Sequence, residues 1–470
     1  MKLTLHPDRL FPAEERTRRI ARGLHEGVRD LPIVSPHGHT DPAWFALNEP
    51  FPDPARLLIT PDHYVLRMLY SQGVRLEDMG IPPLDGGPHE EDGGAIFRLF
   101  AKHYHLFRGT PSRMWLDWVL GEVFGCEEVL EEANADGVYA LVDDALRRPA
   151  FLPRSLYERF GIEVLATTEG ALDELVHHRA LGESGWKGRV ITTYRPDDVI
   201  DPDNSCFAAN LRRFGELTGQ DTLSWQGYLE AHRVRRAYFR EVGSATATDH
   251  GHPTTRTANL PEADAEALFG RVSKGGSSKA DAELFRAQML TEMARMSLAD
   301  GMTMQIHPGV ARSHNPAVAS RFGPDKGGDI PLQTDYVSAL APLLAEVGNE
   351  PDLNIILFTL DEDTYARELA PLAGHYPALL LGPPWWFHDS PEGMRRFRER
   401  TTETAGFYNT AGFNDDTRAF LSIPARHDVA RRMDCGWLAQ LVAEHRLGEA
   451  EAHDVARDLA YGLAKAAYRL

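Results

Sequence analysis

Two histidines one residue apart, His37 and His39, follow the first short apolar run of the chain, Leu31–Ser35. Residues two positions apart on an extended segment face the same side, so both imidazoles can reach one metal ion. On its own this spacing also fits surface or packing histidines. A carboxylate from another strand end would complete a site for zinc, manganese or iron. Asp416 is the candidate, because it follows a late apolar run beside Asp415, which can cap the next helix.

Four further apolar runs end in side chains that suit a binding site. Arg195 follows one of them and can clamp a carboxylate with paired N–H donors, or pair with a nearby Asp to hold a loop. Asp249 and His250 end another run, as part of a site or as a structural pair. His307 ends the third and can ligate a metal, contact a substrate oxygen or lie in the core. Trp385–Phe387 follows the fourth, as a core cluster or as a wall that stacks on a sugar.

The runs that carry these residues recur along the chain as expected of strands that alternate with helices. Several are continuous Val, Ile and Leu segments, which is typical of strands buried on both faces of a parallel sheet. Eight such strands predict an α/β fold, a (β/α)8 barrel of the TIM type. The carboxyl ends of barrel strands form the active site, and the polar residues lie at those ends. The predicted strands are Leu31–Ser35, Glu163–Thr167, Arg189–Tyr194, Ser244–Thr248, Thr303–His307, Asn354–Leu360, Ala378–Gly382 and Ala411–Asn414.

The interval between the first and second predicted strands is too long for one crossover. Its helix-like stretches and many aromatic residues predict a helical insertion after strand 1. We therefore expect three parts: residues 1–41 with strand 1, residues 42–152 as a helical subdomain, and residues 153–470 as the rest of the barrel with C-terminal helices. The glycine-rich stretch 271–278 is expected to be a flexible loop.

Composition argues against several classes of protein. The 470 residues carry 50 Lys and Arg against 69 Asp and Glu, a net charge of −19, which is unlike a nucleic-acid-binding surface. We find no apolar run that is long enough for a transmembrane helix or a secretory signal. Cys126, Cys206 and Cys435 are too dispersed for a disulfide framework or a thiolate zinc site. We expect a cytoplasmic protein without nucleic-acid or membrane partners, and a homo-oligomer is compatible with the sequence.

The order and spacing of these motifs resemble the uronate isomerase (glucuronate isomerase) family, a divergent branch of the amidohydrolase superfamily. The similarity covers nearly the whole chain and is far more specific than any one motif. The matching segments are Ser35–His39, Asp62–Tyr64, Tyr194–Asp197, Asp249–Gly251, Gln305–His307, Phe322–Asp325, Trp385–Phe387 and Asp416–Arg418.

The resemblance implies a metal-dependent active site. His37, His39 and Asp416 would bind one divalent ion, for which we expect zinc, with manganese and iron as alternatives. The other implied site residues are His63 and Tyr64 at the start of the insertion, Arg195 and Arg418 on the substrate, His307 near the metal, and Trp385 or Trp386 along the pocket.

The family reaction interconverts D-glucuronate with D-fructuronate, and D-galacturonate with D-tagaturonate. It moves a proton from C2 to C1 of the hexuronate through a cis-enediol and needs a base on carbon. Tyr64 is the first candidate, with its phenol acidified by a nearby arginine or by the metal, and Asp416 is the second. Arg418 and the metal would stabilise the enediolate charge, with His307 counted among the catalytic residues. Arg195 would hold the uronate carboxylate.

Some positions depart from the family pattern. Ser35 and Gly38 stand where the family often has Asp and Cys, and Ala311–Asn315 and Thr359–Glu362 replace its usual motifs after strands 5 and 6. These changes bear on substrate preference more than on the reaction class. The alternative is a mononuclear metal-dependent hydrolase on the same barrel, and the absence of a Lys at the end of strand 4 favours one metal. A third hypothesis is a non-catalytic binding protein for sugar acids, which has no need of the three metal ligands.

Overall fold

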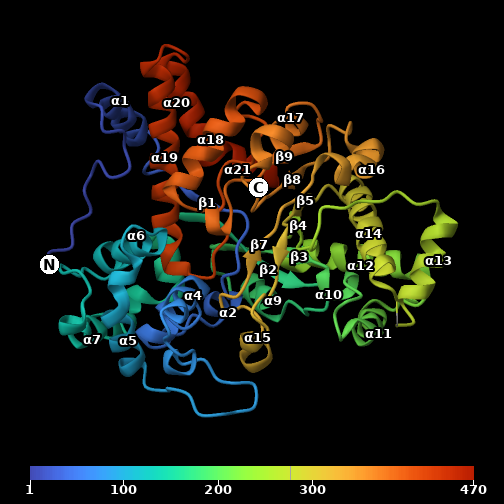
Figure 1. Ribbon diagram of the computed structural model, residues 1–470, viewed down its shortest axis with the longest axis horizontal. Helices are drawn as coiled ribbons and strands as arrows, with labels where there is room; N and C mark the ends of the chain where they lie inside the picture. Colours follow the sequence, from blue (N-terminus) through green and yellow to red (C-terminus); the bar gives the residue numbers. More distant parts are fainter. Residues whose placement is uncertain (276) are drawn as a thin grey trace.

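The computed structural model describes residues 1–275 and 277–470, so the predicted loop over 271–278 includes one residue outside the described part. The described residues form a parallel sheet of seven strands in the order β1-β2-β3-β4-β5-β8-β9, with helices around it (Figure 1). Each of these strands matches a predicted one, with ends shifted by at most three residues. Two more strands, β6 (Val310–Ala311) and β7 (Ile330–Pro331), pair antiparallel outside the sheet. The strands of the main sheet are β1 (Ile33–Ser35), β2 (Ile162–Gly170), β3 (Arg189–Arg195), β4 (Ala247–His250), β5 (Thr303–Ile306), β8 (Ile355–Leu357) and β9 (Leu379–Leu381).

The sheet is curled, because residues at the ends of distant strands touch. β1 and β5 lie four places apart in the strand order, and a flat sheet would separate them by about 19 Å. The rings of His37, after β1, and His307, after β5, nevertheless stack with their centroids 4.9 Å apart. The prediction of an α/β fold built on a parallel sheet is therefore confirmed, and the sheet curls around the strand ends.

The segment predicted as the eighth strand, 411–414, does not form one. Just before it, a single parallel bridge joins Thr410 to Leu381 of β9. Gly412 then takes a φ of +73°, which lies outside the extended region and ends the pairing. The prediction of a regular strand here is wrong, because a backbone turn follows directly after the first paired residue.

Helices fill the interval between β1 and β2, as predicted. The side chains of Asp41, Asp53 and Asp62 each accept a backbone N–H in the first turn of a helix, which explains where three of them begin. Figure 1 shows α4, α5, α6 and α7 grouped on one side of the sheet. Their aromatic residues, such as Phe97 and Phe100 of α5, pack into a hydrophobic core that extends to β1 and β2. These helices are α2 (Pro42–Leu47), α3 (Pro54–Leu58), α4 (His63–Ser71), α5 (Gly93–His103), α6 (Pro111–Trp118), α7 (Ala135–Leu146) and α8 (Pro153–Arg159).

The other helices cover the rest of the sheet. Leu290 of α14 and Leu340 of α16 share one buried cluster with Ile355 of β8. Leu24 of α1 and Leu438 of α19 share another. Within the described ranges, we find no helix with the length and apolar character needed to cross a membrane. These helices are α1 (Glu15–Glu26), α9 (Val176–Glu183), α10 (Asp197–Ile200), α11 (Phe207–Thr218), α12 (Trp225–Gly243), α13 (Glu262–Val272), α14 (Lys279–Asp300), α15 (Pro316–Phe322), α16 (Val337–Val347), α17 (Ala370–Ala373), α18 (Pro391–Ala405), α19 (Ile423–Ala443), α20 (Glu449–Arg457) and α21 (Leu463–Tyr468).

Candidate active site and metal centre

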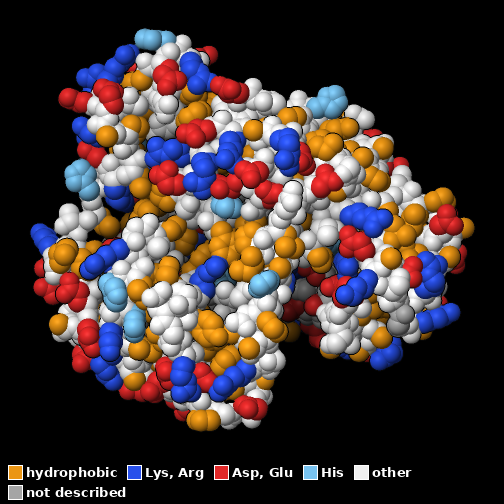
Figure 2. Space-filling view, in the orientation of Figure 1, with side chains coloured by type: hydrophobic (Ala, Val, Ile, Leu, Met, Phe, Trp, Pro, Cys, Tyr) orange, Lys and Arg blue, Asp and Glu red, His pale blue; other side chains and the backbone are white. Residues whose placement is uncertain are grey.

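A cavity of about 380 Å³ lies at the carboxyl ends of the strands. All ten residues predicted for the site line it, and both tryptophans are among them: His37, His39, His63, Tyr64, Arg195, His307, Trp385, Trp386, Asp416 and Arg418. Figure 2 shows hydrophobic side chains gathered near the centre of one face of the molecule, with acidic and basic side chains mixed around them. The curled sheet thus brings together residues that are up to 381 positions apart, from His37 to Arg418.

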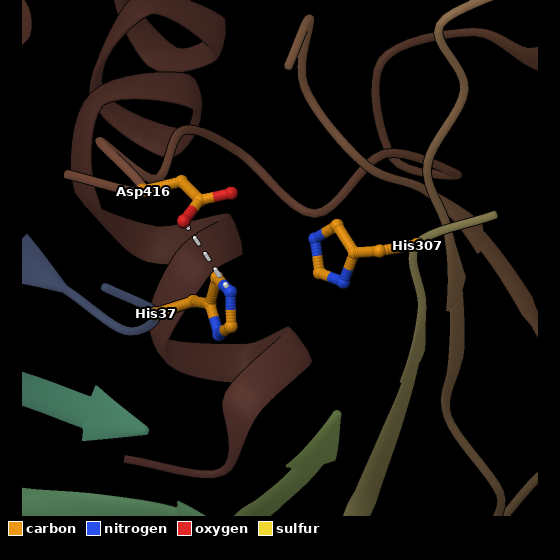
Figure 3. Close-up of side chains that lie close together, drawn as sticks. All are labelled: His37, His307 and Asp416. Carbon is orange, nitrogen blue, oxygen red and sulfur yellow. Dashed lines mark ion pairs between the residues drawn. The ribbon is translucent and has the colours of Figure 1, made fainter. Parts of the chain in front are cut away.

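His37, His39 and Asp416 lie close together, as the predicted metal site requires. Oδ1 of Asp416 lies 3.1 Å from Nε2 of His39 and 3.5 Å from Nε2 of His37. His307 approaches the same point, since one ligand atom each of His37, His307 and Asp416 lie within 4.8 Å of one another. Figure 3 shows the contact between Asp416 and His37 as a dashed line, with the His307 ring beside them. The arrangement can therefore offer imidazole and carboxylate ligands to one ion.

The backbone around this cluster permits close approach. A Cβ on Gly38 would lie 3.4 Å from the carbonyl oxygen of Ala166 and 3.5 Å from that of Thr417, so the backbone here is in van der Waals contact with both segments. Asp416 has a φ of +37°, which is uncommon for a residue with a side chain. Such strain persists only where the surrounding structure holds it, and here it accompanies a carboxylate directed at two histidines.

Burial and mutual contact set the protonation states of the cluster. Burial lowers the pKa of His37 to about 4, so the ring is neutral near pH 7. Burial acts to raise the pKa of Asp416, but the His37 and His39 rings outweigh it and hold that pKa well below its usual range. Neutral imidazoles and an ionised carboxylate are the forms that bind a divalent metal.

His307 is oriented by a chain of charged partners. Its Nδ1 lies 2.6 Å from Oδ1 of Asp249, whose Oδ2 lies 3.2 Å from Nη1 of Arg195. Arg195 in turn donates from Nε to Oδ2 of Asp197 at 2.8 Å. With its proton on Nδ1, His307 presents a lone pair on Nε2, and that buried atom has no hydrogen-bond partner among the described residues. A buried, oriented lone pair of this kind fits a metal ion, so the donor set fits the predicted cofactor.

The predicted site omits Asp249, which is only 1% exposed and lines the cavity. The predicted strand ended at Thr248, whereas β4 continues to His250. Because side chains alternate along a strand, the correct strand end would have directed Asp249 and His250 to opposite sides and identified the carboxylate as the cavity residue. Other charged residues also line the cavity. Asp62, Arg312 and Asp325 lie in segments that the resemblance to the family singled out, whereas Asp329 and Arg426 carried no such signal.

His63 lies on the first turn of α4 and lines the cavity. Its ring stacks on Trp386 with the centroids 5.4 Å apart. Burial, aided by the charge of Arg418, lowers the pKa of His63 to about 3. The ring is therefore neutral near pH 7 and can both donate and accept a hydrogen bond.

Tyr64 follows on the same turn, which Asp62 caps by accepting the Tyr64 N–H at 2.8 Å. Burial raises the pKa of the Tyr64 phenol above its usual value, although the charge of Arg426 acts to lower it. The neighbouring arginine therefore does not by itself acidify Tyr64, and acidification by the metal stays a prediction. Its phenol is protonated at neutral pH because the loss of water around the ring outweighs the arginine.

Arg418 and the two tryptophans occupy different parts of the wall. Arg418 donates to Oδ2 of Asp325 at 2.8 Å and is half exposed. Trp385 is buried and packs on His307, with the ring centroids 4.7 Å apart. Trp386 instead packs on α4. The structure therefore places one indole beside the metal cluster and the other beside the first turn of α4.

A hydrogen-bonded chain from the last helix reaches His37. The amide nitrogen of Gln305 lies 3.3 Å from Nδ1 of His37, and the Tyr468 hydroxyl donates to Oε1 of Gln305 at 2.8 Å. Asn414 donates to that hydroxyl at 3.0 Å. Metal binding through Nε2 of His37 needs the proton on Nδ1, and Gln305 must then present its oxygen instead of its nitrogen. Tyr468 can serve either arrangement, because a hydroxyl both donates and accepts.

We expect Tyr468→Phe to weaken zinc binding by about tenfold, because Gln305 loses the partner that lets it support the metal-binding form of His37. Competition with a coloured chelator measures the zinc dissociation constant. Tyr408→Phe removes a hydroxyl on an exposed side chain and serves as the control. Equal zinc affinity in Tyr468→Phe and the wild type would show that the hydroxyl does not support the ligand.

Known proteins resemble the chain over its full length. The family model described as glucuronate isomerase matches residues 14–468. The uronate isomerase of Rhizobium meliloti (strain 1021) is 65% identical over 470 residues, which cover 100% of both chains. That of Mesorhizobium japonicum is 66% identical over 464 residues, 99% of each chain. The crystal structure of glucuronate isomerase from Caulobacter crescentus has a TM-score of 0.98 and 59% identity, covering 100% of this chain and 98% of that one. The chain therefore belongs to the glucuronate isomerase family.

Proposed function

We propose that the protein is a uronate isomerase, which interconverts D-glucuronate with D-fructuronate and D-galacturonate with D-tagaturonate. One observation supports the proposal above all. In a chain from this family, three predicted metal ligands, a tyrosine and two arginines line the same cavity. The substrate is a small hexuronate, and the enzyme is an aldose–ketose isomerase.

The reaction moves hydrogen within the substrate and leaves its composition unchanged. In the open-chain aldose, the proton on C2 leaves and a proton arrives on C1, through a cis-enediol. The hydroxyl proton on O2 is lost and O1 gains one, so that the carbonyl moves from C1 to C2. The protein must therefore hold the open chain, accept a proton from carbon and return it to the neighbouring carbon.

His37, His39 and Asp416 would hold the metal, with His307 beside them. We favour zinc, with manganese and iron as alternatives, since all three accept imidazole and carboxylate ligands. A bound ion would polarise a substrate oxygen and stabilise negative charge on it. The neutral state of His37, the ionised state of Asp416 and the buried lone pair of His307 support this assignment.

Asp416 and Tyr64 have different proton-transfer roles in this proposal. Asp416 is ionised and can accept a hydroxyl proton as the sugar ring opens. Its low pKa makes it a weak base toward carbon, whereas a phenolate is a far stronger base. We therefore assign the transfer between C2 and C1 to Tyr64, which would first have to give its phenolic proton to a base. The neutral ring of His63, whose centroid lies 4.5 Å from that of Tyr64, is our candidate acceptor. Arg418 would stabilise the negative charge that the transfer creates.

Arg195 would bind the carboxylate of the uronate, and its ion pair with Asp249 holds it in place. A fixed guanidinium favours uronates over neutral sugars, because it recognises a carboxylate through paired charge-assisted hydrogen bonds. His63 would bond to substrate hydroxyls. Trp385 and Trp386 would cover the apolar face of the sugar chain.

We further propose that the segment 411–414 closes the curled sheet into an eight-stranded barrel. At its start, the Ala411 N–H donates to the Leu381 carbonyl of β9 at 2.8 Å. Just after it, the His39 N–H donates to the Thr417 carbonyl at 3.0 Å, beside the end of β1. The segment thus has contacts toward both edge strands of the sheet, which supports closure without a regular ladder.

The proposed organisation of the chain keeps residues 1–41 and 153–470 as the barrel and residues 42–152 as a helical subdomain. The helices from α2 to α7 between β1 and β2 support the middle part. A cytoplasmic location is proposed from the three cysteines, none of which is in a disulfide within the described part of the chain.

The test incubates zinc-loaded protein with D-glucuronate and, separately, with D-galacturonate, and follows the products by NMR. We expect signals of D-fructuronate and D-tagaturonate, and the two rates rank the substrates. A folded, zinc-loaded protein that converts neither uronate would contradict the proposal.

Tyr64→Phe tests the assigned base. We expect kcat for D-glucuronate to fall by about 10²- to 10³-fold with little change in KM, because the ring remains and only the proton-carrying hydroxyl is lost. Tyr70→Phe is the matched control, since Tyr70 lies on the same helix and does not line the cavity. A kcat within a few-fold of the wild type would assign the base to Asp416 instead.

A further inference from the structure

A second pair of histidines repeats the spacing of the first. His250 and His252 flank Gly251 after β4, as His37 and His39 flank Gly38 after β1. The function proposed above uses only the first pair.

Asp197 supplies a carboxylate to the second pair, as Asp416 does to the first. It is the first residue of α10, directly after β3, the neighbour of β4 in the sheet. One ligand atom each of Asp197, His250 and His252 lie within 4.8 Å of one another. The three residues come from two adjacent strand ends, so the fold itself brings them together.

Gly251 allows this close approach. Its backbone N–H donates to Oδ1 of Asp197 at 3.3 Å. A Cβ at this position would collide with the guanidinium of Arg195 and lie 2.8 Å from Oδ2 of Asp197. A side chain at this position would therefore displace Arg195 or Asp197, whereas glycine lets both stay against the backbone between the two histidines.

Both histidines are buried and lack partners for most of their ring nitrogens. His250 is 0% exposed and His252 is 5% exposed. Nδ1 of His250 and both ring nitrogens of His252 are buried without a hydrogen bond to any residue of the described ranges. Nε2 of His250 lies 3.0 Å from the hydroxyl of Thr248. Buried polar atoms are normally paired, so three orphaned nitrogens beside one carboxylate call for a ligand.

The cluster is separate from the substrate cavity. Neither histidine nor Asp197 lines that cavity. For the two histidines the reason is that side chains alternate along β4 and its extension, so both face away from it. Asp249, between Thr248 and His250, faces the cavity instead. A ligand of the second cluster is thus shielded from substrate.

We propose that Asp197, His250 and His252 bind a second divalent metal ion, of the zinc class, which has a structural role. Two imidazoles and one carboxylate are a donor set that zinc accepts, and a shielded site suits a structural ion better than a catalytic one. Oδ2 of Asp197 accepts from Arg195 at 2.8 Å, whereas Oδ1 accepts only the longer 3.3 Å bond from the Gly251 N–H and keeps a lone pair for the ion. The ion would therefore tie the end of β4 to α10 and fix the partner of the arginine that faces the cavity.

Zinc content per chain tests the proposal. Protein is equilibrated with zinc held at a low free concentration by a chelator, separated from it, and measured by mass spectrometry for metal and by absorbance for protein. His37→Asn combined with Asp416→Asn removes the first site. His252→Asn and, separately, Asp197→Asn remove the second. His178→Asn is the control, because it changes a buried histidine outside both clusters.

We expect two zinc ions per chain in the wild type and in His178→Asn. Each variant that removes a single site should retain one zinc ion per chain. A chain that carries the substitutions for both sites should retain no zinc. One ion in the folded wild type, or two ions in both His252→Asn and Asp197→Asn, would overturn the proposal. Circular dichroism and thermal melting verify folding, and Asp197→Asn carries the test if His252→Asn does not fold, because Asp197 is 24% exposed.

Discussion

Asp416→Asn is expected to lower kcat/KM for D-glucuronate by about 10³-fold or more. The change removes the charge that faces His37 and His39 at 3.5 and 3.1 Å, and with it the carboxylate of the proposed metal site. It also removes the proposed acceptor of the hydroxyl proton. Steady-state rates from NMR measure the loss, and zinc content should fall by one ion per chain in the same sample.

Asp363→Asn is the control for Asp416→Asn, because the Asp363 side chain is 87% exposed and does not line the cavity. It should retain the wild-type rate and zinc content. Excess zinc should not restore the rate of Asp416→Asn, since the proton acceptor is still missing. A rate within tenfold of the wild type at saturating zinc would remove Asp416 from the mechanism.

Arg195→Met is expected to affect both activity and stability. Loss of two charge-assisted hydrogen bonds to the uronate carboxylate, each of about 1.5–3 kcal/mol, predicts a fall of about 10²-fold or more in kcat/KM, mainly through KM. The same change leaves Asp249, which is 1% exposed, without its arginine. The buried carboxylate would keep its contact with His307 but lose the arginine charge, which predicts up to about 3 kcal/mol less stability in a denaturant titration.

The double variant Arg195→Met with Asp249→Asn separates the two effects. Removing the stranded carboxylate should restore most of the free energy of unfolding, whereas activity should stay low because the substrate carboxylate still lacks its partner. An unchanged KM for D-glucuronate in Arg195→Met would show that another cation binds the carboxylate. Arg312, which also lines the cavity, would then be the first candidate.

Most of the strands could be predicted because apolar runs are a local property of the sequence, whereas β4 was predicted mainly from its position along the chain. The failure at 411–414 is also local in cause. One glycine with a φ of +73° ends the pairing, and composition does not show whether a glycine adopts that conformation. The predicted limit of β4 was short because its Thr and Asp residues are not apolar, and this hid Asp249.

Most of the candidate site was predictable because its residues lie next to strand ends or helix starts that the sequence marks, and the motif match to the family identified Asp416 and Arg418. His37 and His39 follow an apolar run, and Asp62 before His63 is a helix cap. Their joint placement in one cavity follows from the curl of the sheet. The sequence shows only part of the second cluster. The His250–His252 spacing can be read from it, whereas the proximity of Asp197 to these histidines cannot.

The sequence by itself determined the family, the strand order along the chain and the residue types available for chemistry, because these depend on neighbouring residues and on motif spacing. Only the tertiary structure decided that His307 stacks on His37, that Trp385 and Trp386 take different places, and that burial keeps Tyr64 protonated. The physical reason is that distances between strand ends and the loss of water around a side chain depend on the whole fold. Both are set by residues far away in the sequence.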